Sequence, residues 1–293
     1  MYLTYKYKIT FCLLLLYSIW GSTYIAIEEG LKEMEPLFFS SLRFLLGALI
    51  LFILSLIKKE KFPTKEEFFN AAIMGILLIS LGNGLITIGQ SFHVSSGMAA
   101  ILVATLPIFS ISVGFVSKTH ISRSEWICAG IGFFGIFLLN IENISLEHLM
   151  GPILILFSSF FCAVATIFGK KRRMPKGLLN VAIQLLISGI VLFILSLFFN
   201  EKMNLNLSVK SYAAIFYLAI FGAVIGFLAF NFLTKKTSVL LSTSYAYVTP
   251  IVAITLGIIL NNDHYTLLQW SGMGIIICSV IIYTFFNIKK SSM

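Results

Sequence analysis

The amino-acid sequence predicts an all-α membrane protein whose ten transmembrane helices form two inverted repeats of five helices each. Composition is the first observation behind this prediction, because 58% of the 293 residues are hydrophobic and only 11% are charged. A soluble protein carries about 25% charged residues, and this chain lacks the polar surface that a soluble fold of its size would need. The other two observations are the length of the apolar segments and the placement of the basic residues between them.

Ten segments are long and apolar enough to cross the hydrocarbon core as helices, which takes about 20 residues. They cover residues 9–28, 37–57, 70–90, 97–116, 126–141, 149–169, 178–199, 211–231, 242–260 and 268–287. These segments are apolar on every face, whereas strands of a membrane barrel alternate. The first segment follows basic residues as in a signal peptide, but no clear cleavage site follows it, so we expect it to stay as the first span.

Lysine and arginine predict the orientation of the spans. Seventeen of the 21 basic residues fall in one alternating set of connections and termini, three fall in the other set, and Arg43 lies inside a span. Basic connections stay in the cytoplasm, so both termini are expected there, with an even number of spans. The net charge of +9 is then a topology signal and a contact for anionic lipid, and nucleic acid is not an expected partner.

The two halves of the chain resemble each other, which predicts one repeat over 9–141 and a second over 149–287. The matched residues are Pro107 with Pro250, Gly114 with Gly257, Trp126 with Trp270 and Gly130 with Gly274. Five spans is an odd number, so the second repeat enters the membrane the opposite way up. Transporters use such inverted repeats and bind substrate near mid-membrane at the interface between them.

Several short motifs carry a family resemblance over nearly the whole chain. They are Trp20-Gly21-Ser22-Thr23-Tyr24, Arg43-Phe44, Gly82-Asn83-Gly84, Ser96-Gly97-Met98-Ala99-Ala100, Ala104-Thr105-Leu106-Pro107 and Thr243-Ser244-Tyr245-Ala246-Tyr247-Val248-Thr249-Pro250. Together and in this order, they resemble the EamA family of the drug/metabolite transporter superfamily, and most closely its YedA-type branch of bacterial inner-membrane carriers. The resemblance implies ten helices, two EamA repeats and transport of small metabolites, often amino acids or related compounds.

Arg43 is the charged residue that lies well inside a predicted span, about 10 Å along the helix from Pro36. Burying that charge in a membrane costs a few kcal/mol, so it is a candidate contact for a carboxylate or phosphate of the substrate. A structural role, paired between helices or reaching outward, is the alternative. Gln184 aligns with Arg43 across the repeat, and Asn231 is a further polar candidate.

The remaining candidates are an amide, four aromatic residues and two prolines. Asn83 lies between two glycines, and it either lines the substrate pocket or joins helices. Trp20, Tyr24, Tyr245 and Tyr247 offer aromatic surface with a polar tip; Tyr245 and Tyr247 point about 200° apart on a helix, so we expect only one of them in the pocket. Pro107 and Pro250 each free a backbone carbonyl, and they are expected to bend or gate their helices.

These features predict a secondary transporter that exports a small metabolite by alternating access. A proton or another ion as coupling partner, and a homodimer, stay open. No HExxH, GxSxG or phosphate-loop motif occurs, and the four cysteines have no metal-ligand spacing, so no enzyme activity, metal or cofactor is expected. The alternatives are an integral membrane enzyme acting on lipid or isoprenoid phosphates, or a membrane sensor or scaffold without transport.

Overall fold

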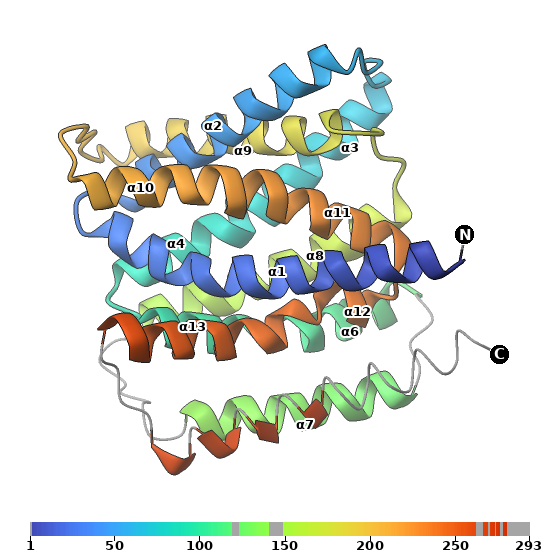
Figure 1. The fold of residues 1–293 in the computed structure, drawn as a ribbon, viewed down its shortest axis with the longest axis vertical. Coiled ribbons are helices and arrows are strands. Elements are labelled where there is room, and N and C mark those ends of the chain that lie inside the picture. Colours follow the sequence, from blue (N-terminus) through green and yellow to red (C-terminus); the bar gives the residue numbers. More distant parts are fainter. Residues whose placement is uncertain are drawn as a thin grey trace.

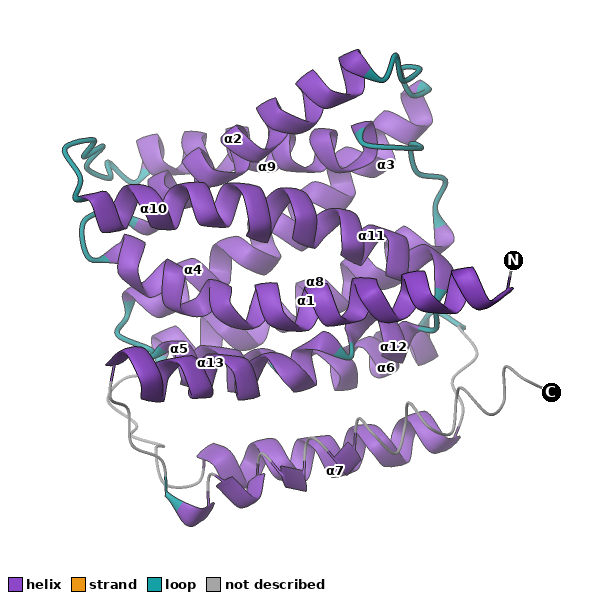
Figure 2. Cartoon of the chain, in the orientation of Figure 1, coloured by secondary structure: helices purple, strands orange, loops and turns teal. Residues whose placement is uncertain are grey.

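The computed structural model describes residues 2–118, 123–140, 149–261, 266–268, 270–272, 274–275 and 278–279. Its elements are α1 (Tyr2–Leu31), α2 (Pro36–Ile57), α3 (Lys65–Gly75), η1 (Ile76–Gly84), α4 (Leu85–Ser91), α5 (Ser96–Val103), α6 (Leu106–Val116), α7 (Arg123–Asn140), α8 (Met150–Lys171), α9 (Leu179–Phe198), α10 (Val209–Tyr217), η3 (Leu218–Ile225), α11 (Gly226–Lys236), α12 (Val239–Thr243) and α13 (Tyr245–Asn261). Helices are the only regular structure in these ranges (Figure 2), which confirms the all-helical class.

Eight helical segments of the described chain are long and apolar enough to span a membrane. They are Tyr7–Leu31, Pro36–Ile57, Lys65–Ser91, Ser96–Val116, Met150–Lys171, Leu179–Phe198, Val209–Lys236 and Val239–Leu260. The predicted fifth span falls on α7. The predicted tenth span, 268–287, lies mostly outside the described residues, so a count of ten stays a prediction.

Four of the described spans are irregular, and they form two matched pairs. They are numbered here by their order in the predicted set of ten. The third and eighth spans each contain a π-helical segment, η1 and η3, and the two segments begin 142 positions apart at Ile76 and Leu218. The fourth span breaks between α5 and α6, and the ninth breaks between α12 and α13 at Ser244. π-Helical turns occur mostly as rare, local features at functional sites, so these four spans stand out from the regular helices around them.

The helices pack side by side with their axes roughly aligned (Figure 1). α2 lies against α9, α1 lies against α13 and α11, and α8 lies against η1, α4 and α6. α7 lies at the margin of the bundle, against α6 (Figure 1). Large buried side chains, including Phe44, Phe227 and Phe230, fill the centre, where α1, α2 and α11 meet.

Helices α2 and α9 are antiparallel, and two glutamates close both ends of the pair. Glu60, just after α2, accepts hydrogen bonds from the backbone N–H groups of Leu178 (2.9 Å) and Leu179 (3.1 Å) at the start of α9. Glu201, just after α9, accepts them from Leu37 (3.0 Å) and Phe38 (2.7 Å) at the start of α2. Carboxylates suit these positions because the first N–H groups of a helix lack partners and carry partial positive charge.

Gly177 makes the contact of Glu60 possible. Its φ of +72° lies in the left-handed region, and a Cβ there would come within 2.2 Å of the Glu60 carboxylate. Glycine tolerates this conformation and leaves the necessary space. The local sequence thus provides both the acceptor and the gap for one end of the α2–α9 pair.

The basic connections gather at one end of the bundle. Glu60 meets the 172–178 connection there, Arg173 lies 3.4 Å from Glu67, and Lys235 donates to the Pro175 carbonyl at 3.3 Å. The opposite end carries the acidic α1–α2 connection, where Glu33 accepts a hydrogen bond from the Ser208 N–H at 2.8 Å. Within the described residues, the two sets of connections that the charge pattern distinguishes thus lie at opposite ends.

Candidate functional site

An aromatic cluster at the centre of the bundle joins three helices. Trp20 of α1 lies 4.5 Å, between ring centroids, from Tyr245 of α13 and 5.3 Å from Phe227 of α11. Phe230 lies 5.5 Å from Trp20. The Trp20 indole N–H donates to the Gly222 carbonyl at 3.1 Å, so the ring is fixed by both packing and a hydrogen bond. We call Trp20, Phe227, Phe230 and Tyr245 the aromatic cluster.

Arg43 extends this cluster with a buried positive charge. Only 3% of the residue is exposed, and its guanidinium lies 4.5 Å from the centroid of the Phe44 ring, which in turn packs on Phe227 at 6.3 Å. One terminal nitrogen, Nη2, donates to the Thr87 hydroxyl at 3.0 Å. The Nε–H has no hydrogen-bond partner, and no carboxylate of the described chain forms an ion pair with the guanidinium. A buried cation without a counter-charge is costly, and it is suited to an anionic group of a ligand.

Asn83 reaches Arg43 through its backbone. The Thr87 hydroxyl, which accepts from Arg43, donates to the Asn83 carbonyl at 3.1 Å. The Asn83 side-chain amide is half-buried and makes a long bond of 3.4 Å to the Leu78 carbonyl within η1. The sequence identified this residue by its side chain; the structure shows that its carbonyl, in the π-helical segment, orients the group that holds Arg43.

The two tyrosines of the ninth span face different neighbours. Tyr245 packs on Trp20, as described above. The Tyr247 ring lies in a separate cluster with Ile101, Ala104 and Ile254, close to Gly132 of α7. The fourth aromatic candidate, Tyr24, is buried beside Thr249, and its backbone carbonyl accepts a hydrogen bond from the Gln90 amide at 3.1 Å.

Gln184 and Asn231 belong to a separate amide network, which we define as Asn180, Gln184 and Asn231. Asn231 Oδ1 accepts from Asn180 Nδ2 at 3.0 Å and from Gln184 Nε2 at 3.2 Å, and Gln184 Nε2 also donates to Asn180 Oδ1 at 3.0 Å. Sequence analysis missed Asn180, although its spacing of four residues before Gln184 places both on one helix face. Because α2 and α9 are antiparallel, this network lies toward the basic end and Arg43 toward the acidic end.

The paired prolines occupy different places in their helices. Pro107 stands in the first turn of α6, where the missing N–H breaks no helical bond. Pro250 lies inside α13, six residues into the helix, where the absent N–H does interrupt the ladder. Both are buried, and each follows closely on a break in its span.

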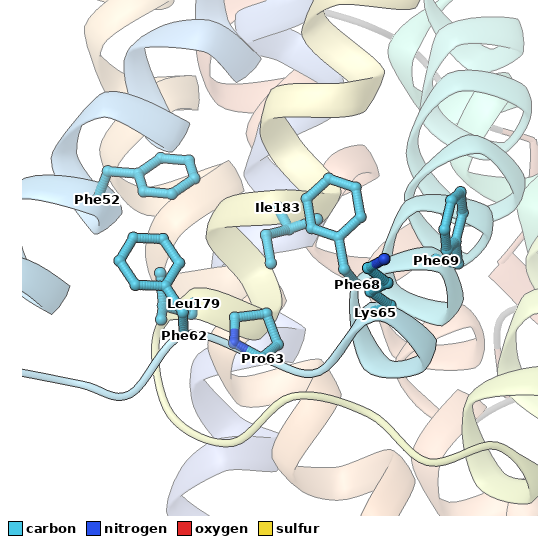
Figure 3. A pocket seen from close by; sticks show the side chains of 8 residues that line it. All are labelled: Phe52, Phe62, Pro63, Lys65, Phe68, Phe69, Leu179 and Ile183. Carbon is cyan, nitrogen blue, oxygen red and sulfur yellow. The ribbon is translucent and has the colours of Figure 1, made fainter.

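Two cavities open toward opposite ends of the bundle. A cavity of about 850 Å³ lies at the acidic end and is lined by Glu28, Glu33, Glu35 and Gln90 among others. A smaller cavity of about 330 Å³ at the basic end is lined mainly by apolar side chains, Phe62 and Phe68 among them, together with Lys65 (Figure 3). These acidic residues join Gln90 in one cavity because α1 and α4 pack against each other.

Comparison with known proteins settles the family. The model of the EamA-like transporter family matches residues 8–141 and again residues 149–285. The chain belongs to this EamA-like transporter family. The chain is 36% identical over 269 residues to "Uncharacterized inner membrane transporter YedA" of Escherichia coli (strain K12), which covers 92% of this chain and 88% of that protein. It is 24% identical over 273 residues to "Uncharacterized transporter YoaV" of Bacillus subtilis (strain 168), covering 91% and 93%.

A solved crystal structure shows the same fold as this EamA-family chain. The two superpose with a TM-score of 0.75 at 13% sequence identity, and the match covers 95% of this chain and 97% of the other. The family model and the 36% identity to the Escherichia coli protein confirm the family resemblance predicted from the motifs. Together with the eight candidate spans, family membership makes this a multi-pass membrane protein of the transporter type.

Proposed function

We propose that the protein is a secondary transporter that moves a small metabolite across the cytoplasmic membrane by alternating access. The cargo is an amino acid or a related compound with an anionic group, and the direction is export. The relatives named above are described as transporters, one of them of the inner membrane, and both termini are assigned to the cytoplasm by the basic connections. The driving force is a solute gradient, with a proton or another ion as the candidate coupling partner.

The proposed mechanism rests on one observation. Glu60 at the end of α2 binds the start of α9, and Glu201 at the end of α9 binds the start of α2. Two equivalent helices that run in opposite directions support an inverted repeat, over 9–141 and 149–287. In such a repeat, exchanging the conformations of the two halves converts an outward-facing state into an inward-facing one. The irregular third, fourth, eighth and ninth spans are the candidates to move, because their π-helical turns and breaks give them flexible points, while α2 and α9 form the regular pair around which they rock.

Arg43 and the aromatic cluster supply the proposed substrate contacts. The guanidinium is positioned by Phe44 and Thr87 before any ligand binds, so little side-chain entropy is lost when an anion arrives. A carboxylate also neutralises a charge that is costly while buried. Trp20 and Tyr245 then offer an apolar surface for the rest of the molecule, and Tyr24, Tyr247, Asn83, Gln184 and Asn231 are proposed as further contacts in other steps of the cycle.

Transport can be tested in cells and in vesicles. We expect cells that overproduce the protein to show a changed level of at least one anionic or zwitterionic metabolite in an untargeted comparison, and proteoliposomes to carry that compound. The Arg43→Gln variant is expected to lose most of this flux, and Arg43→Lys part of it, whereas Lys210→Gln in the exposed first turn of α10 should transport normally. Equal flux through the wild type and Arg43→Gln would contradict the assigned contact, and no flux of any compound would contradict transport.

The same comparison tests the alternatives that the sequence left open. A change confined to lipid or isoprenoid phosphates would favour an integral membrane enzyme. Unchanged levels of every metabolite would favour a sensor or scaffold. In the described part of the chain, no group of three His, Cys, Asp or Glu side chains is placed to hold a metal ion, and no observation singles out either alternative.

A further inference from the structure

The wall of the cavity at the acidic end contains a buried acceptor without a donor. Gln90, at the end of α4, is 5% exposed and lines this cavity. Its Nε2 donates to the Tyr24 carbonyl at 3.1 Å, while its Oε1 has no hydrogen-bond partner. The orientation of the amide is fixed chemically, because a flipped amide would place two acceptors against each other. An unsatisfied buried carbonyl of this kind favours a ligand that donates a hydrogen bond.

Glu28 places a negative charge beside this acceptor. It lies one helical turn beyond Tyr24 on α1 and lines the same cavity. Its Oε2 accepts from the Ser96 N–H at 3.1 Å, which fixes the carboxylate at the wall of the cavity and leaves Oε1 available. A fixed carboxylate and an amide oxygen together suit a positively charged donor.

The other charges around the cavity favour a cation. Its lining includes the carboxylates of Glu33 and Glu35 together with Lys32 and Lys202. Lys32 already forms an ion pair with Glu29 at 2.5 Å, which reduces its repulsion toward a cationic ligand. A volume of about 850 Å³ admits a small organic molecule rather than only a bare ion.

We propose that this cavity is a binding site for an organic ammonium group, held between the Glu28 carboxylate and Gln90 Oε1. The position of Gln90 connects the site to Arg43, because Thr87, which holds Arg43, lies three residues earlier on the same helix. A molecule with an amine at one end and a carboxylate at the other can pass from the first contact to the second. As a docking point for cargo the site rests on the proposed transport function, but as a binding site it stands independently.

Calorimetric titration of the purified protein in phosphatidylcholine nanodiscs tests the site. The three ligands are n-butylammonium, butyrate and n-butanol, at about pH 8, where the amine is protonated and the carboxylate is ionised. We expect saturable binding of butylammonium alone. Glu28→Gln, which keeps an acceptor for Ser96, and Gln90→Leu each remove one partner of the ammonium group. Each should weaken butylammonium binding about tenfold. Glu66→Gln, which changes an exposed carboxylate at the opposite end of the bundle, should bind as the wild type does.

Each outcome decides the proposal. Absence of butylammonium binding, equal binding of butyrate, or unchanged affinity in Glu28→Gln would overturn it. Glu28→Gln keeps the test decisive if Gln90→Leu, which also loses the bond to Tyr24, fails to fold. Binding of butylammonium without any flux in the transport assay would leave this site in place and remove the transport proposal, so the two failures are distinguishable.

Discussion

Glu60 and Glu201 stand 141 positions apart and bind each other's helices. Glu60, just after α2, accepts N–H hydrogen bonds from the start of α9, and Glu201, just after α9, accepts them from the start of α2. The arrangement is symmetric in detail, since Lys59 and Asn200, the residues before them, both have a left-handed φ, of 51° and 54°. Two separate turns therefore adopt the same conformation at opposite ends of one antiparallel pair. The α2–α9 pair is therefore held by equivalent hydrogen bonds at both of its ends.

Removing either carboxylate should destabilise the protein. Glu60→Ala or Glu201→Ala leaves two helix N–H groups without acceptors, and the loss of such a cap costs about 1–2 kcal/mol. The two sites lie about 30 Å apart along the helices, so their effects should add in the double variant. Thermal unfolding in detergent measures this, with the exposed Glu66→Ala as control. Strong non-additivity would mean that the two ends are coupled.

Stability should depend on pH through Glu201. Burial at the start of α2, together with the nearby Glu35, raises the pKa of Glu201 despite its two N–H bonds. The folded protein therefore binds a proton more tightly than the unfolded chain, and the contribution of this group falls as pH rises from the ordinary carboxyl value through the raised native pKa. The wild type should lose stability relative to Glu201→Gln as the pH rises from about 4 through the raised native pKa. A constant difference across that range would contradict the raised pKa.

Substitution of Arg43 should affect the stability of the protein and its transport activity differently. Arg43→Met keeps the apolar stem and removes a buried charge that lacks a counter-charge and whose desolvation costs several kcal/mol. We therefore expect an unchanged or higher unfolding temperature together with loss of the proposed flux. A clear loss of stability would instead support the structural role that the sequence left as the alternative.

A substitution in the amide network should lower the stability of the protein, unlike Arg43→Met. Asn231→Leu removes the oxygen that accepts from both Asn180 and Gln184, and leaving buried donors unsatisfied costs about 1–3 kcal/mol. The unfolding temperature should fall accordingly. Asn206→Leu, in an exposed connection, is the matched control, and equal stability of the two variants would show that the network contributes nothing.

Gly226 should be sensitive to a single methyl group. A Cβ at this position would lie 2.2 Å from the indole nitrogen of Trp20, whereas a Cβ at Gly130 meets nothing within 4 Å. Gly226→Ala should cost about 1–3 kcal/mol through overpacking and shift the tryptophan fluorescence as Trp20 moves. Gly130→Ala should be neutral or slightly stabilising. Indistinguishable spectra and stabilities would contradict the close approach of α1 and α11.

Much of the fold could be predicted from the sequence, because a segment that crosses a lipid bilayer must meet simple requirements of length and hydrophobicity. Eight predicted spans agree with the structure to within a few residues, since a span must be apolar and about 20 residues long. Within the described residues, the grouping of connections into a basic and an acidic end also follows the charge pattern. The π-helical turns left no such signal, because a helix with one extra residue per turn has the same apolar composition as a regular one.

The candidate site was predictable only in part. Arg43 was identifiable because a charge within an apolar segment is conspicuous. Trp20 packs on Tyr245 and is linked to Arg43 through Phe227 and Phe44. Gln184 was expected near the substrate because it aligns with Arg43, yet the antiparallel packing of α2 and α9 places it toward the other end. Asn180 was missed, and the contact of Gln90 with Tyr24 could not be foreseen, since a single buried amide has no sequence pattern that reveals its partners.

The sequence by itself determined that this chain is a helical membrane protein of the EamA-like transporter family, with its spans and its two charged ends. Only the tertiary structure decided which polar side chains meet: Arg43 with Thr87, Gln184 with Asn180 and Asn231, and Gln90 with Tyr24. The physical reason is that insertion into lipid depends on the sum of apolar residues along one segment. Contact between helices depends on the relative rotation and depth of two segments, and helices apolar on every face do not encode that rotation locally.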